Sequence, residues 1–249
     1  MFDKDFKTSL LIRLIVGRGW GQGPTHSQSY HSFLSSLPGI NVLYPFDPNS
    51  AYHTIKYGMT SKIPTLMIEH RWLHNSISKV NFNDNSFILG KCKILQKGSD
   101  LTLVASSNMV IESLKVLEII KKNHINLNVE LIDVRTYKPL DINTILKSVK
   151  KTGRLIVVDP GFDNCSFGSE IISQISTKAF KYMKTPPIKI ASHDIPEPTS
   201  FFYTKKFNIN YRTILNKISE VFKHKKLEKI NLKKEKYHDI PGDWFKGPF

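Results

Sequence analysis

The sequence predicts an α/β protein in which a small N-terminal part precedes a larger domain with a mostly parallel sheet. Short apolar runs of strand length alternate with longer amphipathic segments of helix length along most of the 249 residues. A polar, asparagine-rich stretch at residues 75–86 interrupts this alternation and is typical of a linker. With 40% hydrophobic and 11% aromatic residues, the composition is that of an ordinary globular protein.

The N-terminal part contains three predicted strands and two predicted helices. The strands are expected at residues 10–16, 41–44 and 65–68, and the helices at 27–37 and 48–60. Asp47 suits the N-cap of the second helix, and Pro48 suits its first position. A sheet of only three strands has an exposed edge, so we expect missing sequence or a partner to cover it.

The second part contains enough elements for a complete domain. Strands are expected at residues 87–95, 101–105, 129–133, 155–159 and 188–191, with helices at 108–122, 142–150, 168–182 and 211–222. Asp141 precedes an amphipathic segment and suits its N-cap, and Ser166 with Glu170 suits the start of the following helix. Parallel strands joined by helices are therefore predicted here.

A glycine-rich loop at residues 17–29 follows the first strand directly. Glycine occupies every second position from Gly17 to Gly23, which permits backbone conformations and close approaches that side chains forbid. The loop does not match a dinucleotide fingerprint, since Gln22 or Pro24 stands where the third glycine is needed, and it lacks the lysine of a phosphate loop. We therefore predict the functional site at this loop, where the end of the first strand presents His26.

The loop sequence GPTHSQS at residues 23–29, followed by LPGINV at 37–42, resembles the beta subunit of thiamine diphosphate-dependent 2-oxo acid dehydrogenases. Four further blocks match that family in the same order: PTLMIE at 64–69, LGKCKI at 89–94, ELIDVRT at 130–136 with PLD at 139–141, and SVKKTGR at 148–154. The resemblance extends from about residue 10 to residue 221 and includes the pyruvate and branched-chain types of the family.

The resemblance implies a domain organisation. Residues 1–80 would be the C-terminal remnant of a thiamine pyrimidine-binding domain with the start of a linker, and residues 81–224 a transketolase C-terminal-like domain. Residues 225–249 would form a basic tail with an aromatic end. Family members carry a long segment before the glycine loop, including the glutamate that activates the aminopyrimidine of the cofactor. We therefore expect this chain to lack the N-terminal part of the pyrimidine-binding domain.

The resemblance also implies a reaction and partners. The reaction would be oxidative decarboxylation of a 2-oxo acid with acyl transfer to a lipoyl group. Thiamine diphosphate would lie at an interface with an alpha subunit, which would hold the magnesium ion, in a heterotetramer that includes a second beta subunit. The lipoyl acyltransferase core is a further expected partner. Which 2-oxo acid is used is not readable from the sequence.

His26 is the predicted catalytic residue, because an unperturbed imidazole titrates near pH ~6.5 and a loop at a strand end can place it against a substrate. Ser27 and Gln28 are positioned to orient it. Spacing alone favours another interpretation, in which Thr25, Ser27 or Ser29 caps a helix and His26 is an exposed loop residue. The resemblance places His26 beside the reactive carbon of thiamine, for proton transfer or for reductive acylation of the lipoyl group. The residues that bind the cofactor are not identified.

No metal site is predicted. His70 and His74 follow the third strand at a spacing that suits a metal only on a helix, and Glu69 gives no H-E-x-x-H pattern. These histidines are expected at the crevice between the two parts. Asp159 ends a strong strand of the second part, where open parallel sheets commonly border ligand crevices.

The formal net charge of +15 comes almost entirely from lysine. The arginines are Arg13, Arg18, Arg71, Arg135, Arg154 and Arg212. Because arginine is the preferred side chain for forked contacts to bases and phosphates, nucleic-acid binding is not predicted as the main role.

No apolar stretch reaches the roughly 20 residues that a membrane helix needs. Cys92 and Cys165 fit no disulfide or metal pattern, which favours a reducing cytoplasm.

Three alternatives remain open from the sequence. The chain is either a subunit of an active dehydrogenase or a non-catalytic assembly protein derived from that family. Another thiamine enzyme, such as a transketolase, and a basic nucleic-acid-binding protein are further alternatives. In the tail, Trp244, Phe245 and Phe249 are expected to dock on a neighbouring subunit or on the chain's own surface.

Overall fold

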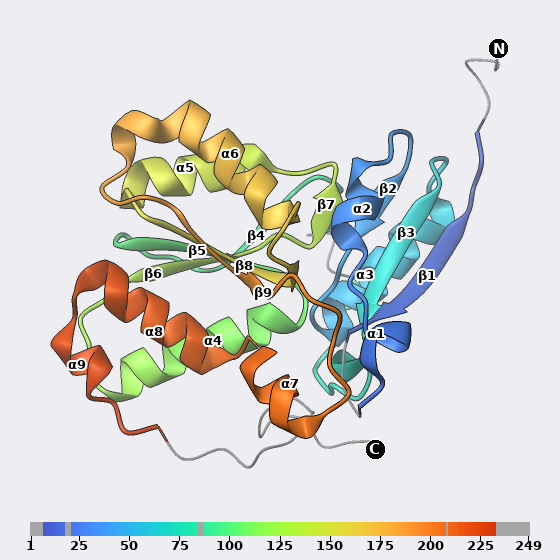
Figure 1. The fold of residues 1–249 in the computed structure, drawn as a ribbon. Coiled ribbons are helices and arrows are strands. Elements are labelled where there is room, and N and C mark those ends of the chain that lie inside the picture. The colour runs from blue at the N-terminus through green and yellow to red at the C-terminus, as the bar shows by residue number, and fades with distance from the viewer. Residues whose placement is uncertain (1–6, 18–20, 84–86, 208, 233–249) are drawn as a thin grey trace.

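The computed structural model describes residues 7–17, 21–83, 87–207 and 209–232, and it confirms the α/β class with mostly parallel sheets (Figure 1). The strands form one sheet of four and one of five. Among the described residues, none of the helices combines the length and apolar character that a membrane crossing requires.

The smaller sheet has the order β1-β3-β2-β7. β1 (Leu11–Val16) and β2 (Asn41–Leu43) run parallel to β3 (Thr65–His70), which lies between them. Every residue of β3 is buried, as expected for the central strand of a parallel sheet. All three predicted strands of the N-terminal part are therefore confirmed.

The helix α3 (Pro48–Thr60) has the predicted bounds and the predicted cap. The Asp47 carboxylate accepts a hydrogen bond from the Ser50 backbone N–H at 2.7 Å, and the Ser50 hydroxyl accepts one from the Asp47 N–H at 3.1 Å. A methyl group placed on Gly58 would lie 2.6 Å from Leu11 Cδ1, so α3 packs closely on β1. The reciprocal cap formed by Asp47 and Ser50 explains why the start of α3 could be predicted from the sequence.

The fourth strand of this sheet was not predicted. β7 (Thr136–Lys138) comes from the larger part of the chain and pairs antiparallel with β2. The expectation of a three-stranded sheet was wrong because three residues are too few to show an alternating pattern. β7 closes one edge of the sheet, whereas β1 pairs only with β3 among the described residues.

The larger sheet has the predicted mostly parallel arrangement. Its order β4-β6-β5-β8-β9 is formed by β4 (Lys93–Gln96), β6 (Val129–Asp133), β5 (Leu101–Ala105), β8 (Leu155–Phe162) and β9 (Ile188–Ser192). Only β4 is antiparallel to its neighbour. One face is covered by α5 (Ile142–Thr152) and α6 (Phe167–Ala179), and the other by α4 (Asn108–Lys122) and α8 (Tyr211–Phe222) (Figure 1).

Several predicted elements differ in extent. The predicted strand at 87–95 begins only at β4, because Gly90 turns the chain at φ +70° and the Cys92 N–H donates to the Asp141 carboxylate. In place of the predicted helix at 168–182, the α-helix α6 stops at Ala179, and the last three residues form the short 3-10 helix η2 (Phe180–Tyr182). The predicted helix at 27–37 is confined to α2 (His31–Ser36).

Four short helical segments were not predicted. They are α1 (Gly23–His26), the 3-10 helix η1 (Arg71–Leu73), α7 (Phe201–Phe207) and α9 (Lys225–Glu228). The expectation that Trp244, Phe245 and Phe249 dock on a surface concerns residues outside those described.

The two sheets share one hydrophobic core. A cluster of buried residues includes Val42 and Ile68 of the smaller sheet together with Val104 and Ile132 of the larger one. A second cluster fills the space between the larger sheet and helices α4 and α8. The buried contact between the sheets fixes how the glycine-rich loop lies against the larger part of the chain.

Candidate functional site

Two described glycines of the glycine-rich loop lie where a side chain would not fit. Gly17 has a φ of +97°, and a methyl group placed on it would lie 2.4 Å from Nε2 of His70. Gly23 has a φ of +57°, and a methyl group there would lie 2.6 Å from Cγ2 of Thr199. The loop is thus held between β3 and the segment that follows β9.

His26 is the last residue of α1, and its side chain is exposed. Arg71 donates from Nη2 to the His26 carbonyl at 2.8 Å and from Nη1 to the Gln22 side chain, so one guanidinium ties both ends of α1. Burial lowers the pKa of Arg71, and the Glu197 carboxylate opposes that change. The structure therefore presents the predicted catalytic imidazole to solvent on a fixed backbone.

The alternative interpretation of this motif was wrong about the helix N-cap, whereas its expectation that His26 is exposed is confirmed. The N-cap of α2 is Tyr30 and that of α1 is Gln22, and neither makes a side-chain capping hydrogen bond. The hydroxyl of Ser27 is buried and makes no hydrogen bond within the described part of the chain, so it does not hold the His26 ring. The catalytic role of His26 remains a prediction.

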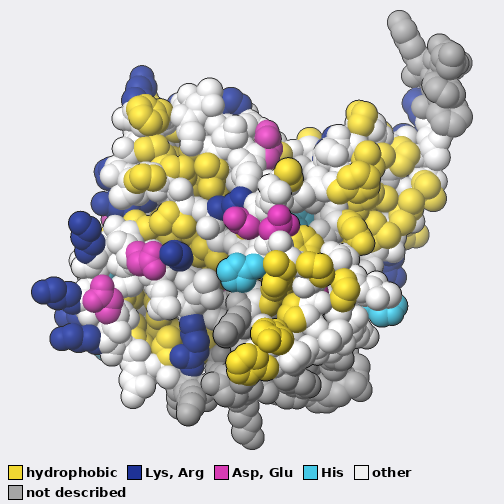
Figure 2. All heavy atoms as spheres, viewed as in Figure 1, with side chains coloured by type: hydrophobic (Ala, Val, Ile, Leu, Met, Phe, Trp, Pro, Cys, Tyr) yellow, Lys and Arg dark blue, Asp and Glu magenta, His cyan; other side chains and the backbone are white. Residues whose placement is uncertain are grey.

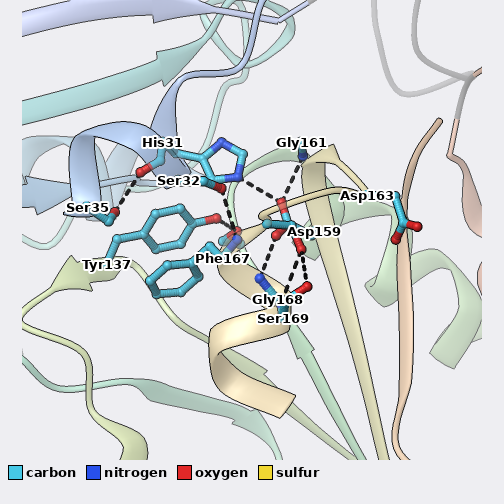
Figure 3. Close-up of polar contacts among 12 residues, drawn as sticks. His31, Ser32, Ser35, Tyr137, Asp159, Gly161, Asp163, Phe167, Gly168 and Ser169 are labelled. Carbon is cyan, nitrogen blue, oxygen red and sulfur yellow. Dashed lines mark hydrogen bonds and ion pairs between the residues drawn. The ribbon is translucent and has the colours of Figure 1, made fainter. Parts of the chain in front are cut away.

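A buried histidine–aspartate pair lies beside this segment (Figure 3). His31 Nε2 donates to Asp159 Oδ1 at 2.8 Å, and the two side chains are 0% and 1% exposed. Asp159 also accepts the backbone N–H of Gly161 at 2.8 Å and that of Gly168 at 2.7 Å. Burial alone would raise the pKa of Asp159, but the charge and hydrogen bond of His31 and the two backbone N–H groups outweigh it and lower the pKa.

Aromatic rings enclose this pair. The ring of Tyr137 stacks on that of Phe167 at a centroid distance of 3.9 Å and lies edge-on to His31 at 5.2 Å (Figure 3). The Tyr44 ring lies 5.8 Å from the His31 ring. The sequence predicted Asp159 at a strand end, whereas β8 continues to Phe162. It gave no reason to select His31, because 128 positions separate the two residues.

A second buried ion pair lies where β6 leaves the larger sheet. Arg135 donates from Nε to Asp133 Oδ2 at 2.9 Å, and its Nη2 lies 2.9 Å from the same oxygen as an ion pair. The Asp133 side chain is fully buried. Burial raises the pKa of Asp133 to about 6, although the Arg135 charge opposes this. The Arg135 carbonyl accepts the Tyr44 N–H at 2.8 Å and so joins the two parts of the chain.

The structure places His70 and His74 at different sites, although the sequence predicted both at the crevice between the two parts. His70 lines a small crevice between the two sheets with Ser29, Asn108 and Pro160, as expected from the sequence. His74 Nε2 instead lies 3.2 Å from Glu69 Oε2, whose carboxylate also accepts from both Nε and Nη2 of Arg13. Among the described residues, no three histidine, cysteine or acidic side chains converge in a way that would hold a metal ion.

The Arg13–Glu69–His74 group forms one wall of an open cavity of about 320 Å³. The opposite walls include the apolar side chains of Phe46, Met67 and Leu73. This cavity lies on the α3 face of the smaller sheet, because Met67, Glu69 and the neighbouring Arg13 share the face to which the Thr54 hydroxyl of α3 donates. The cavity is thus a feature separate from His26.

Replacing Gly23 with alanine should loosen the loop. An alanine at φ +57° carries a backbone cost of roughly 1–2 kcal/mol and its methyl would also meet Thr199. Gly39→Ala is a matched control, since Gly39 has a φ of +81° with nothing within 4 Å of the added methyl. Urea unfolding should show the larger loss of stability for Gly23→Ala. Equal losses would mean that Thr199 does not restrain the loop.

Comparison with known proteins gives consistent similarities. Residues 90–213 match the family described as "Transketolase, C-terminal domain". The chain is 36% identical over 186 residues to the "Pyruvate dehydrogenase E1 component subunit beta-1, mitochondrial" of Oryza sativa subsp. japonica, covering 73% of this chain and 49% of the relative. It is 31% identical over 196 residues to the "Pyruvate dehydrogenase E1 component subunit beta" of Rickettsia bellii, covering 79% of this chain and 60% of the relative.

A solved structure described as "Split gene transketolase, inactive beta4 tetramer" shares the fold, with a TM-score of 0.70 at 17% identity. The match covers 87% of this chain and 67% of that one. The chain spans about half the length of the curated relatives that it matches, such as 49% of the Oryza protein and 47% of a homologue from Chaetomium thermophilum.

Proposed function

Since this chain belongs to the transketolase-like family that includes the beta subunits of pyruvate dehydrogenase, we propose that it takes part in oxidative decarboxylation of a 2-oxo acid. The acyl group formed would be transferred to a lipoyl group. The observation that carries this proposal is the exposed imidazole of His26 on a short helix whose backbone Arg71 restrains. Imidazole is the side chain that most often serves as a general acid or base in enzymes.

The described residues do not by themselves fit thiamine diphosphate. A carboxylate facing the aminopyrimidine would have to be unengaged, yet Glu69 in the open cavity is bound by Arg13 and His74. The described part of the chain also offers no group of acidic or histidine side chains for magnesium. We therefore place the cofactor, as a proposal, at an interface with an alpha subunit that holds the magnesium ion. When bound there, the cofactor would supply the electron sink for decarboxylation.

Association with other subunits is supported by the surface of the smaller sheet. Exposed apolar side chains occur on and beside β1 and on α2, and Figure 2 shows apolar side chains gathered over this part of the molecule. They include Leu10, Ile12, Ile15, Phe33 and Leu37. A patch of this kind on the edge strand favours a protein partner. The proposed partners are the alpha subunit, a second beta subunit in a heterotetramer and the lipoyl acyltransferase core.

The proposal is tested by mixing the purified chain with the alpha subunit from the same source. Reduction of an artificial electron acceptor is then measured with pyruvate and with branched-chain 2-oxo acids, with and without thiamine diphosphate and magnesium. We expect turnover only when both subunits and the cofactor are present. Stable binding of the alpha subunit without turnover on any 2-oxo acid would contradict a catalytic role.

A non-catalytic assembly protein is the second candidate. The engagement of Glu69 by two basic side chains supports it, because that carboxylate is then not available to activate a cofactor. The exposed apolar side chains of the smaller sheet suit this role equally.

Free cysteines at Cys92 and Cys165 support the further proposal of a reducing compartment, the cytoplasm.

A further inference from the structure

The helix that follows His26 is attached to the larger part of the chain. Ser32 accepts the Phe167 N–H at 2.9 Å (Figure 3). Lys138 Nζ donates to the Ser35 carbonyl at 3.1 Å. His31 is bound to Asp159. Three hydrogen bonds along α2 therefore join this helix to β7, β8 and α6, although the helix belongs to the N-terminal part of the sequence.

Of the three hydrogen bonds that attach α2 to the larger part of the chain, the one between His31 and Asp159 is fully buried. Asp159 is held by three donors, and the ring of His31 has little space to move. A methyl group placed on Gly161 would lie 2.5 Å from Cε1 of His31, so the ring packs directly on that backbone. Removing one member of a buried charged pair leaves the other without compensation, which makes this attachment the costly one to break.

His26 lies between this attachment and a second one. On one side, Gly23 packs on Thr199, and Arg71 holds the His26 carbonyl. On the other side, only residues 27–30 separate His26 from His31. Five residues of extended chain reach at most about 18 Å, so fixing His31 limits where His26 can lie.

We propose that His31 and Asp159 are a positioning pair that fixes the His26 segment against the larger domain. The pair does not touch substrate in this proposal and acts only through the backbone of residues 27–30. Its effect on turnover rests on the proposed function, whereas its effect on the mobility of residues 21–30 does not.

The test is hydrogen exchange of the full chain, followed by mass spectrometry of its peptides. Asp159→Asn should speed exchange of peptides from residues 21–30 by roughly tenfold or more, while peptides from β5 remain as slow as in the native protein. Asp163→Asn is the matched control, because Asp163 directly follows β8, the strand that contains Asp159, but its side chain is 62% exposed and pairs with Lys189. It should leave residues 21–30 unchanged.

Rescue by a conservative variant separates positioning from general support of the fold. His31→Gln retains an N–H donor for Asp159 and should exchange more slowly at residues 21–30 than His31→Ala. Unchanged exchange at residues 21–30 in Asp159→Asn would overturn the proposal. So would an equal increase in β5, because that result would mean that the pair merely stabilises the whole protein.

The assembled enzyme supplies the functional readout. Asp159→Asn should lower kcat with little change in KM, and it should add no further loss to a His26→Ala background. Faster exchange with unchanged kcat would overturn the positioning role in turnover. Absence of turnover in the native assembly would count against the proposed function alone, since the exchange result would still decide whether the pair fixes the His26 segment.

Discussion

Replacing His26 with alanine should lower turnover of the assembled dehydrogenase by about 10²–10⁴-fold, the range typical of a lost general acid or base. The side chain is exposed at the end of α1, so its removal leaves the packing of the loop intact. Affinity for thiamine diphosphate should change little, because the proposed role is proton transfer. The measurements are kcat by electron-acceptor reduction and cofactor affinity by titration.

The control for this variant is His74→Ala. This substitution removes another partly exposed imidazole, which pairs with Glu69 on the α3 face of the sheet and has no role in the proposal. Native turnover in His26→Ala would contradict the catalytic assignment. A loss of cofactor affinity as large as the loss of turnover would assign His26 to binding instead.

Replacing Arg135 with alanine should have the largest effect on stability, about 3–5 kcal/mol at neutral pH. The Arg135 side chain is 6% exposed, and its guanidinium donates a hydrogen bond to, and forms an ion pair with, the fully buried Asp133 carboxylate. Without Arg135, that carboxylate would be buried and unpaired. Urea unfolding monitored by circular dichroism measures the change.

The pH dependence of this loss has a definite sign. The pKa of Asp133 is about 6 in the native chain, above its ordinary value of 3.8, and burial is the main cause. A raised carboxyl pKa makes the protein less stable as pH rises from about 4 through 6, because the folded state then binds more protons than the unfolded state. Loss of Arg135 raises this pKa further, so the cost of Arg135→Ala should shrink as the pH approaches 4.

A second substitution checks the cause. Adding Asp133→Asn to Arg135→Ala removes the uncompensated charge and should recover part of the lost stability at neutral pH. A double variant no more stable than the single one, with no dependence on pH, would show that the loss comes from packing of the arginine stem and not from the carboxylate.

Elements with strong local signals were predicted closely. The helices α3 and α8 have the predicted bounds, since each begins at a side-chain cap and continues as an apolar stripe. The strands β5 and β6 also match, because each is a short, fully buried segment in which most residues are apolar. For the candidate site, the sequence located the glycine-rich loop and selected His26, and the structure shows where the residue lies.

The amino-acid sequence alone therefore predicts the class of fold and the segments whose signals lie within a few consecutive residues. The pairing of β7 with β2, the bond between His31 and Asp159, and the hydrogen bonds from Arg71 to α1 are set by the three-dimensional fold. These contacts join residues 45 to 128 positions apart, where local propensity carries no information about the partner. The packing of the two sheets around one core selects those partners.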